Sequence, residues 1–210
     1  VVLTAEGEKM LPAVRAFLSQ ENRMHELAAN INGLDIGLIT IAAYSSIATH
    51  WLPKVVAAFK KKYPKITVNL MEGVRQEVLQ WMAEGRADIG FTSGGDDIDG
   101  DWVPLADDRM IAILPRDHPL ANTESFPLER CKHEGLIMPA MGKDEDVMTM
   151  LKKYGIEPNI VYSTNESFSA WALVENGLGI SLTNELIVNG WICDVAKVPV
   201  SPPEKITLGM

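Results

Sequence analysis

Small hydroxyl side chains follow several of the expected strands, where the chain turns into its next helix or loop. Open α/β sheets bind ligands beyond the carboxyl ends of their strands, so these positions predict a small-molecule site. Backbone N–H groups at a helix start, beside a hydroxyl, favour an anionic guest such as a carboxylate. Each residue alone could be only a helix cap, and the argument for a site is convergence on one cleft. The hydroxyl candidates are Ser45, Ser46, Thr92, Ser93 and Thr164. The turn Ala140, Met141 and Gly142, which follows another expected strand, is a further candidate.

Residues suited to catalysis or to metal binding are sparse. None of the four histidines lies beside a nucleophile in a GxSxG turn, and neither GxGxxG nor a Walker sequence is present. Cys131 and His133 could supply two metal ligands, but no second pair stands at zinc spacing. The aspartates between 96 and 108 favour a solvated loop over a calcium loop, because they lack the EF-hand order. We therefore expect no enzyme, no metal ion and no cofactor.

Composition narrows the possible partners. The 210 residues carry a net charge of −9, which argues against direct nucleic-acid binding by this chain. No apolar run approaches the roughly 18 to 20 residues that a membrane span needs, so we expect no membrane contact. Two cysteines are too few for a disulfide scaffold, and a reducing compartment fits best. The start at Val1, without Met or a signal sequence, suggests a fragment or a processed product.

The first thirty residues predict a long amphipathic helix. Apolar residues recur at steps of seven: Leu3, Met10, Phe17, Met24 and Ile31. Such a heptad pattern favours lengthwise pairing of helices between two copies of the chain. The alternative is a single helix docked on its own domain, and Pro12 leaves a kink or a later helix start open.

Beyond residue 33 the pattern alternates between short apolar runs and helical spacing. Such alternation predicts an α/β fold with right-handed crossovers and an open parallel sheet, repeated in two similar subdomains with a cleft between them. Thr164 or Asn165 is the candidate cap of the last expected helix. Strands are expected at 34–39, 66–70, 88–91, 109–114, 136–138, 160–162 and 180–182, with helices around 47–59, 74–82, 147–151 and 168–174 and a loop over 94–108.

In this order and spacing, several short motifs resemble those of the LysR-type transcriptional regulators, over almost the whole chain. The motifs are Leu3–Leu11 at the start of a linker helix, Leu34–Gly37, Trp51–Pro53, Tyr63–Pro64, Gly85–Gly90, His118–Ala121 and Val174–Ile180. Ser45, Ser46, Thr92, Ser93 and the turn 140–142 match the family's effector-binding turns. One departure is Thr183, where the family usually has Pro.

The resemblance implies two Rossmann-like subdomains joined by crossover strands, similar to periplasmic binding proteins and preceded by a long linker helix. Residues 1–32 would be the linker and dimerisation helix, 33–114 subdomain I, 115–205 subdomain II and 206–210 the start of the return crossover.

The implied function is a cytoplasmic sensor that binds a small metabolite in the cleft between its subdomains. Its linker helices form homodimers that assemble into tetramers, and it reaches DNA only through a winged helix-turn-helix domain that this chain lacks. The alternative is a solute-binding protein of a transport system, which shares the architecture. The heptad helix and the missing signal peptide argue against it.

Overall fold

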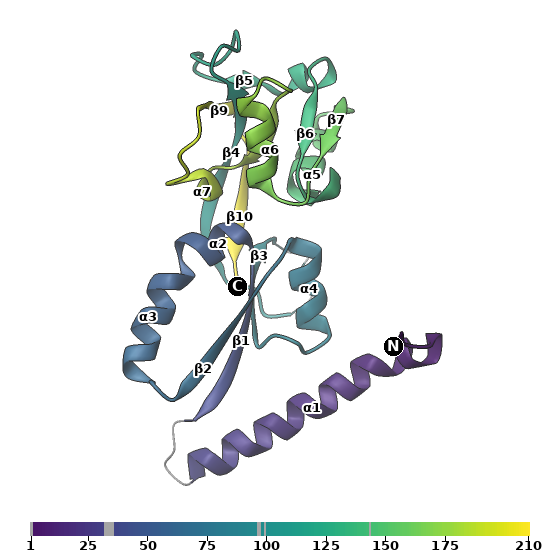
Figure 1. Cartoon of the computed structure of the whole chain (residues 1–210), viewed down its shortest axis with the longest axis vertical. Coiled ribbons are helices and arrows are strands. Elements are labelled where there is room, and N and C mark those ends of the chain that lie inside the picture. The colour runs from purple at the N-terminus through teal and green to yellow at the C-terminus, as the bar shows by residue number, and fades with distance from the viewer. Residues whose placement is uncertain (1, 32–35, 96–97, 99, 143) are drawn as a thin grey trace. The chain divides into compact units, whose positions relative to one another are not determined.

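The computed structural model describes residues 2–31, 36–95, 98, 100–142 and 144–210 (Figure 1). The chain separates into two compact units, a first unit of residues 1–92 with Met210 and a second unit of residues 93–209. The subdomain boundaries expected from the sequence, 33–114 and 115–205, remain a prediction. Within the described ranges, no helix is long and apolar enough to cross a membrane.

The first unit begins with the long helix α1 (Ala5–Ile31). The amphipathic helix expected from the heptad pattern is therefore confirmed. It begins at Ala5, so the later start that Pro12 left open is wrong. Arg15 Nη1 donates to Glu84 Oε2 at 2.6 Å. Among the apolar side chains of α1 that the structure describes, those of Met10, Val14, Phe17, Leu18 and Met24 are exposed, as is that of Leu3 just before the helix.

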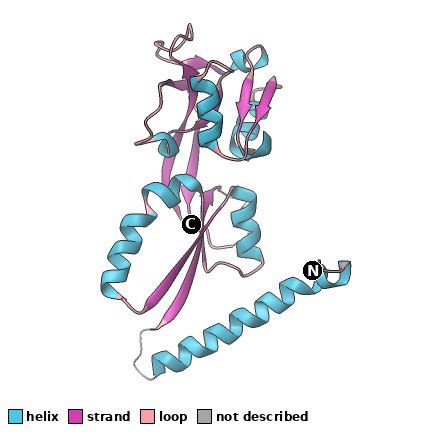
Figure 2. Cartoon of the chain, viewed as in Figure 1, coloured by secondary structure: helices cyan, strands magenta, loops and turns pink. Residues whose placement is uncertain are grey.

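A parallel sheet with its connecting helices forms the rest of the first unit. Strand β1 (Gly37–Ala43) lies between β2 (Ile66–Glu72) and β3 (Ile89–Ser93), with Ala43 opposite both Glu72 and Phe91. The connecting helices are α2 (Ser45–His50), α3 (Leu52–Lys62) and α4 (Arg75–Ala83). This β-α-β-α-β order confirms the expected alternation (Figure 1). Figure 2 shows the helices in cyan and the strands in magenta.

Two details of the first unit differ from the expectation. The single helix expected around 47–59 is divided into two helices. Pro53 lacks an N–H group and lies in the first turn of the second helix, α3, where no such group is needed. The first strand runs over 37–43 instead of 34–39, and residues 34–35 lie outside the described residues. Its buried end contains Ala42 and Ala43, which carry little strand propensity of their own.

In the second unit the long strand β4 (Pro104–Pro115) pairs antiparallel with β8 (Ser181–Asn184), β9 (Val195–Ser201) and β10 (Lys205–Gly209). The strand β6 (Leu136–Met138) pairs parallel with β7 (Ile160–Ser163), and the two-residue strand β5 (Phe126–Pro127) pairs parallel with β9. The helical elements are η1 (Leu128–Lys132), η2 (Ala140–Gly142), α5 (Glu145–Lys153), α6 (Ser167–Glu175) and α7 (Glu185–Val188).

The prediction of a loop over 94–108 is wrong at its end, because residues 104–108 belong to strand β4. Long-range partners hold this acidic stretch in a strand. Asp107 accepts hydrogen bonds from Lys205 Nζ and Thr207 Oγ1 on β10, and Asp108 accepts one from Asn184 Nδ2. These partners are 76 to 100 residues away in sequence, so local composition does not reveal them.

Candidate functional site

The carboxyl ends of β1 and β3 lie side by side in the first unit. Tyr44 N donates to Phe91 O at 2.9 Å, immediately after the last paired residues of the two strands. Helix α2 then begins at Ser45, and β3 continues through Thr92. The structure therefore brings Ser45, Ser46 and Thr92 to one edge of the sheet, as the sequence predicted.

Two of these hydroxyls are buried and have no hydrogen-bond partner in the part of the chain that the structure describes. Ser46 is 1% exposed and Thr92 is 2% exposed. Neither Ser46 Oγ nor Thr92 Oγ1 has a hydrogen-bond partner among the described residues. A buried polar group left unsatisfied costs about 1 to 3 kcal/mol, so such groups in a native protein call for an explanation. A bound ligand that accepts from both hydroxyls would supply one.

The helix-cap alternative does not explain the two serines. The residue at the N-cap position of α2 is Tyr44, whose side chain makes no capping hydrogen bond. Ser45 and Ser46 already lie inside the helix. Because α2 has only six residues, the case for binding rests on the buried hydroxyls and not on the helix start.

Ser93, the first residue of the second unit, is already engaged. Its Oγ donates to Asp146 Oδ1 and Oδ2 at 2.8 and 2.9 Å. Asp144 caps the same helix, α5, by accepting from Val147 N at 3.1 Å. Burial raises the pKa of the Asp144 carboxyl to about 6. An anion that approached the Ser93 hydroxyl would meet acidic neighbours.

The turn 140–142 has an unusual backbone that the sequence did not reveal. Ala140, Met141 and Gly142 all have positive φ, at 53°, 53° and 79°, a region that L-residues seldom occupy. Their N–H groups donate to carbonyls within the second unit, so they are not free to bind an anion. The side chain of Met141 is 63% exposed.

Thr164 lies next to this turn. Its carbonyl accepts from Met141 N at 2.8 Å, and its Oγ1 donates to the Glu166 carbonyl at 2.9 Å. The N-cap of α6 is Glu166, so the expectation that Thr164 or Asn165 caps this helix is wrong. The Thr164 hydroxyl donates to the carbonyl of Glu166 and does not accept from the N–H groups in the first turn of α6.

His50 is a residue that sequence reasoning did not nominate. Its Nε2 is buried and has no hydrogen-bond partner among the described residues. Ser46 and His50 are four residues apart on α2, which places both side chains on one face of the helix. That spacing was the available signal in the sequence.

The residues considered for metal binding have other roles. Burial raises the pKa of the Cys131 thiol to about 12, so this cysteine stays protonated, and His133 is exposed. Asp107 and Asp108 are held by the partners named above, and Asp96, Asp97 and Asp99 lie outside the described residues. Where the chain is described, no group of three or more potential ligand side chains could hold a metal ion.

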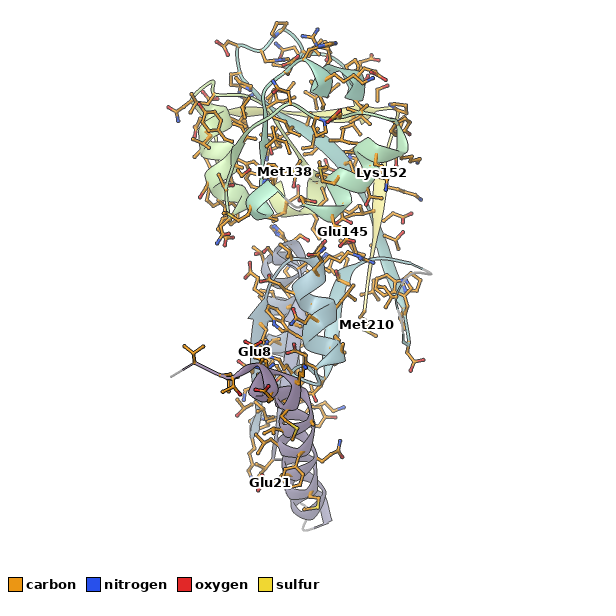
Figure 3. The ribbon with its side chains drawn as sticks, turned by 90° about the vertical axis from the view of Figure 1, so that its right-hand side faces the viewer. Glu8, Glu21, Met138, Glu145, Lys152 and Met210 are labelled. Carbon is orange, nitrogen blue, oxygen red and sulfur yellow. The ribbon has the colours of Figure 1, made fainter. Side chains whose placement is uncertain are left out.

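A surface groove of about 400 Å³ runs along α5 and residues 155–158. Glu145 and Lys152, near the two ends of the helix, belong to its lining (Figure 3). None of the nominated site residues lines this groove, so it is a separate feature of the second unit.

The sequence model of the LysR substrate binding domain matches residues 32–209. A relative, the uncharacterized HTH-type transcriptional regulator YvbU of Bacillus subtilis, is 30% identical over 193 residues. The match covers 90% of this chain and 65% of YvbU, so the chain spans just under two thirds of that relative.

Solved structures share the fold. The regulatory domain of Synechocystis CcmR in complex with 2-PG has a TM-score of 0.73 at 20% identity, covering 82% of this chain and 85% of that one. The effector-binding domain of BenM with benzoate has a TM-score of 0.69 at 24% identity, covering 82% and 81%. These likenesses confirm the expected α/β fold of two subdomains, similar to that of periplasmic binding proteins.

Proposed function

The chain belongs to the family of LysR substrate-binding domains, and on this premise we propose that it is the effector sensor of a LysR-type transcriptional regulator. It binds a small metabolite that carries a carboxylate or a similar acidic group. Binding changes the populations of its conformations, because the effector has different affinities for them. Linker helix α1 passes this change to the DNA-binding domain of the whole protein.

The pair of unpartnered hydroxyls, Ser46 Oγ and Thr92 Oγ1, is the observation that carries this proposal. Both groups donate to the acidic oxygens of the effector, with Ser45 beside them. Ligands in the related structures support the size and chemistry of such a guest, since CcmR was solved with 2-PG and BenM with benzoate.

The turn Ala140–Gly142 and Thr164, both within the second unit, remain predicted effector-binding residues. Because their N–H and hydroxyl groups are internally bonded, they would bind a ligand by shape, and the exposed side chain of Met141 supplies apolar surface. Ser93 takes part only if the effector displaces Asp146 from its hydroxyl. This requirement makes Ser93 the weakest contact of the set.

The oligomeric state follows from α1. Its exposed apolar stripe pairs with the same stripe of a second copy, and the resulting homodimers assemble into tetramers. We place the proposed regulator in the cytoplasm, as its role in transcription requires. The net charge of −9 keeps this part of the protein away from DNA. Relatives named as transcriptional regulators favour this role over a solute-binding protein and over an enzyme.

A thermal-shift screen against small carboxylates tests the proposal. A ligand that binds only the folded state raises the melting temperature of the wild-type chain. In the double variant Ser46→Ala, Thr92→Val the same ligand should give a much smaller rise. An equal rise in both proteins would show that the ligand binds elsewhere.

A further inference from the structure

Three buried polar atoms of the first unit lack a hydrogen-bond partner among the described residues: Ser46 Oγ, Thr92 Oγ1 and His50 Nε2. The first two belong to the proposed effector site. The third, Nε2 of the His50 imidazole, has not been assigned to that site.

Helical geometry places His50 beside Ser46. Both belong to α2, one turn apart, where side chains spaced by four residues are neighbours at roughly 5 to 6 Å between Cβ atoms. Thr92 stands at the end of β3, next to the strand from which α2 departs. Ser46 and Thr92 therefore lie at the same end of the parallel sheet, and His50 lies one helical turn along α2 from Ser46.

The cost of leaving these groups unpaired argues for a ligand. Each unsatisfied buried group lowers stability, and an apolar side chain in its place would avoid that loss. Ser46 and Thr92 are buried residues, and the Nε2 atom of His50, one turn from Ser46, is buried as well. A ligand that completes all three groups would remove this cost.

We propose that His50 Nε2 forms a third hydrogen bond to the effector, which makes His50 a specificity-determining residue; this inference rests on the function proposed above. A neutral imidazole with its proton on Nε2 donates one hydrogen bond, as do the hydroxyls of Ser46 and Thr92. Three donors at one edge match an oxyanion, either a carboxylate or a phosphate. Effectors with such a group are therefore selected over neutral analogues of the same shape.

The test uses the whole 210-residue chain and three probes: benzoate, shikimate and inorganic phosphate. Protein labelled with ¹⁵N is titrated with each probe while the imidazole signals and the backbone amides of Ser46 and Thr92 are followed by NMR. Signals of His50 are assigned by their loss in His50→Gln. His118 serves as an internal control, because both of its ring nitrogens are occupied, by Leu120 N and by Glu134.

Variants add a second readout. His50→Leu removes the nitrogen, His50→Gln keeps an N–H group near the position of Nε2, and His133→Leu is the control at an exposed histidine of the second unit. For a probe that binds, we expect the affinity to fall about tenfold in His50→Leu, less in His50→Gln and not at all in His133→Leu. Without a probe, the melting temperature of His50→Leu should be equal to that of the wild type or higher.

The outcomes separate the two proposals. A probe that shifts the amides of Ser46 and Thr92 together with the His50 imidazole supports both. A probe that shifts these amides and leaves His50 Nε2 unchanged, with equal affinity in His50→Leu, overturns the role of His50 and leaves the proposed function intact. A lower melting temperature of His50→Leu with unchanged affinity shows a structural histidine. If no probe shifts the amides of Ser46 and Thr92, both proposals are contradicted.

Discussion

The hydroxyl of Ser93 donates to both carboxylate oxygens of Asp146, at 2.8 and 2.9 Å, whereas the hydroxyl of the preceding residue, Thr92, has no partner among the described residues. Two consecutive residues of β3, both nominated from the sequence for effector binding, thus have different roles. The hydroxyl of Ser93 is satisfied within the protein, and we assign the hydroxyl of Thr92 to the proposed effector.

Ser93→Ala should destabilise the second unit. A hydrogen bond to a charged group contributes about 1.5 to 3 kcal/mol, and its loss leaves the Asp146 carboxylate with fewer donors. We expect the free energy of unfolding to fall by about 1 to 2 kcal/mol in urea titrations. Ser169→Ala, at an exposed position of α6, is the control and should change it by less than about 0.5 kcal/mol. An equal effect of both variants would refute the structural role of Ser93.

The opposite result is expected for Ser46→Ala and Thr92→Val. Each variant removes a buried group that has no hydrogen-bond partner within the described ranges, so the unfolding free energy should stay the same or rise slightly. Binding of an effector found by the thermal-shift screen should weaken about tenfold per lost hydrogen bond, as measured by calorimetry. A variant that loses stability and keeps its affinity would count against the ligand assignment.

Asp144 should make stability depend on pH. Burial raises the pKa of its carboxyl to about 6 in the folded chain, above its ordinary value of 3.8. The folded state therefore binds more protons than the unfolded state between these values, and this contribution to stability is present below pH 3.8 and is lost as the pH rises through 6.

Asp144→Asn removes this dependence and keeps an N-cap side chain. Relative to the wild type, the variant should gain about 2 kcal/mol between pH 4 and pH 7, measured as the difference in unfolding free energy. Asp117→Asn, at an exposed position of the same unit, should show no such gain. If the unfolding free energies of Asp144→Asn and the wild type differ by the same amount at pH 4 and at pH 7, the raised pKa is contradicted.

Phe17→Glu tests the pairing of α1. Phe17 is 72% exposed in the single chain and lies on the heptad stripe, so a charge there would be buried in a helix pair. Light scattering after size exclusion should show a dimer or a tetramer for the wild type and for Phe17→Leu, and a smaller species for Phe17→Glu. A monomeric wild type would exclude pairing through α1.

The sequence predicted those features that depend on local pattern. Apolar spacing predicts the helix α1 and the alternation of strands and helices in the first unit. The common carboxyl edge of parallel strands predicts that Ser45, Ser46 and Thr92 lie close together. It did not predict the extension of β4 over residues 104–108, because the partners of Asp107 and Asp108 come from distant segments.

Individual hydrogen bonds were also beyond sequence reasoning. The engagement of Ser93 by Asp146 depends on where α5 packs, and the left-handed backbone of Ala140 and Met141 has no signature in those residue types. His50 was overlooked because a histidine is informative only when its partners, or their absence, are known.

The most direct test is a crystal structure of the chain with an effector found by the thermal-shift screen. We expect an acidic oxygen of the ligand within about 3.2 Å of both Ser46 Oγ and Thr92 Oγ1. A ligand bound elsewhere, for example in the groove along α5, with both hydroxyls still unpaired, would contradict it.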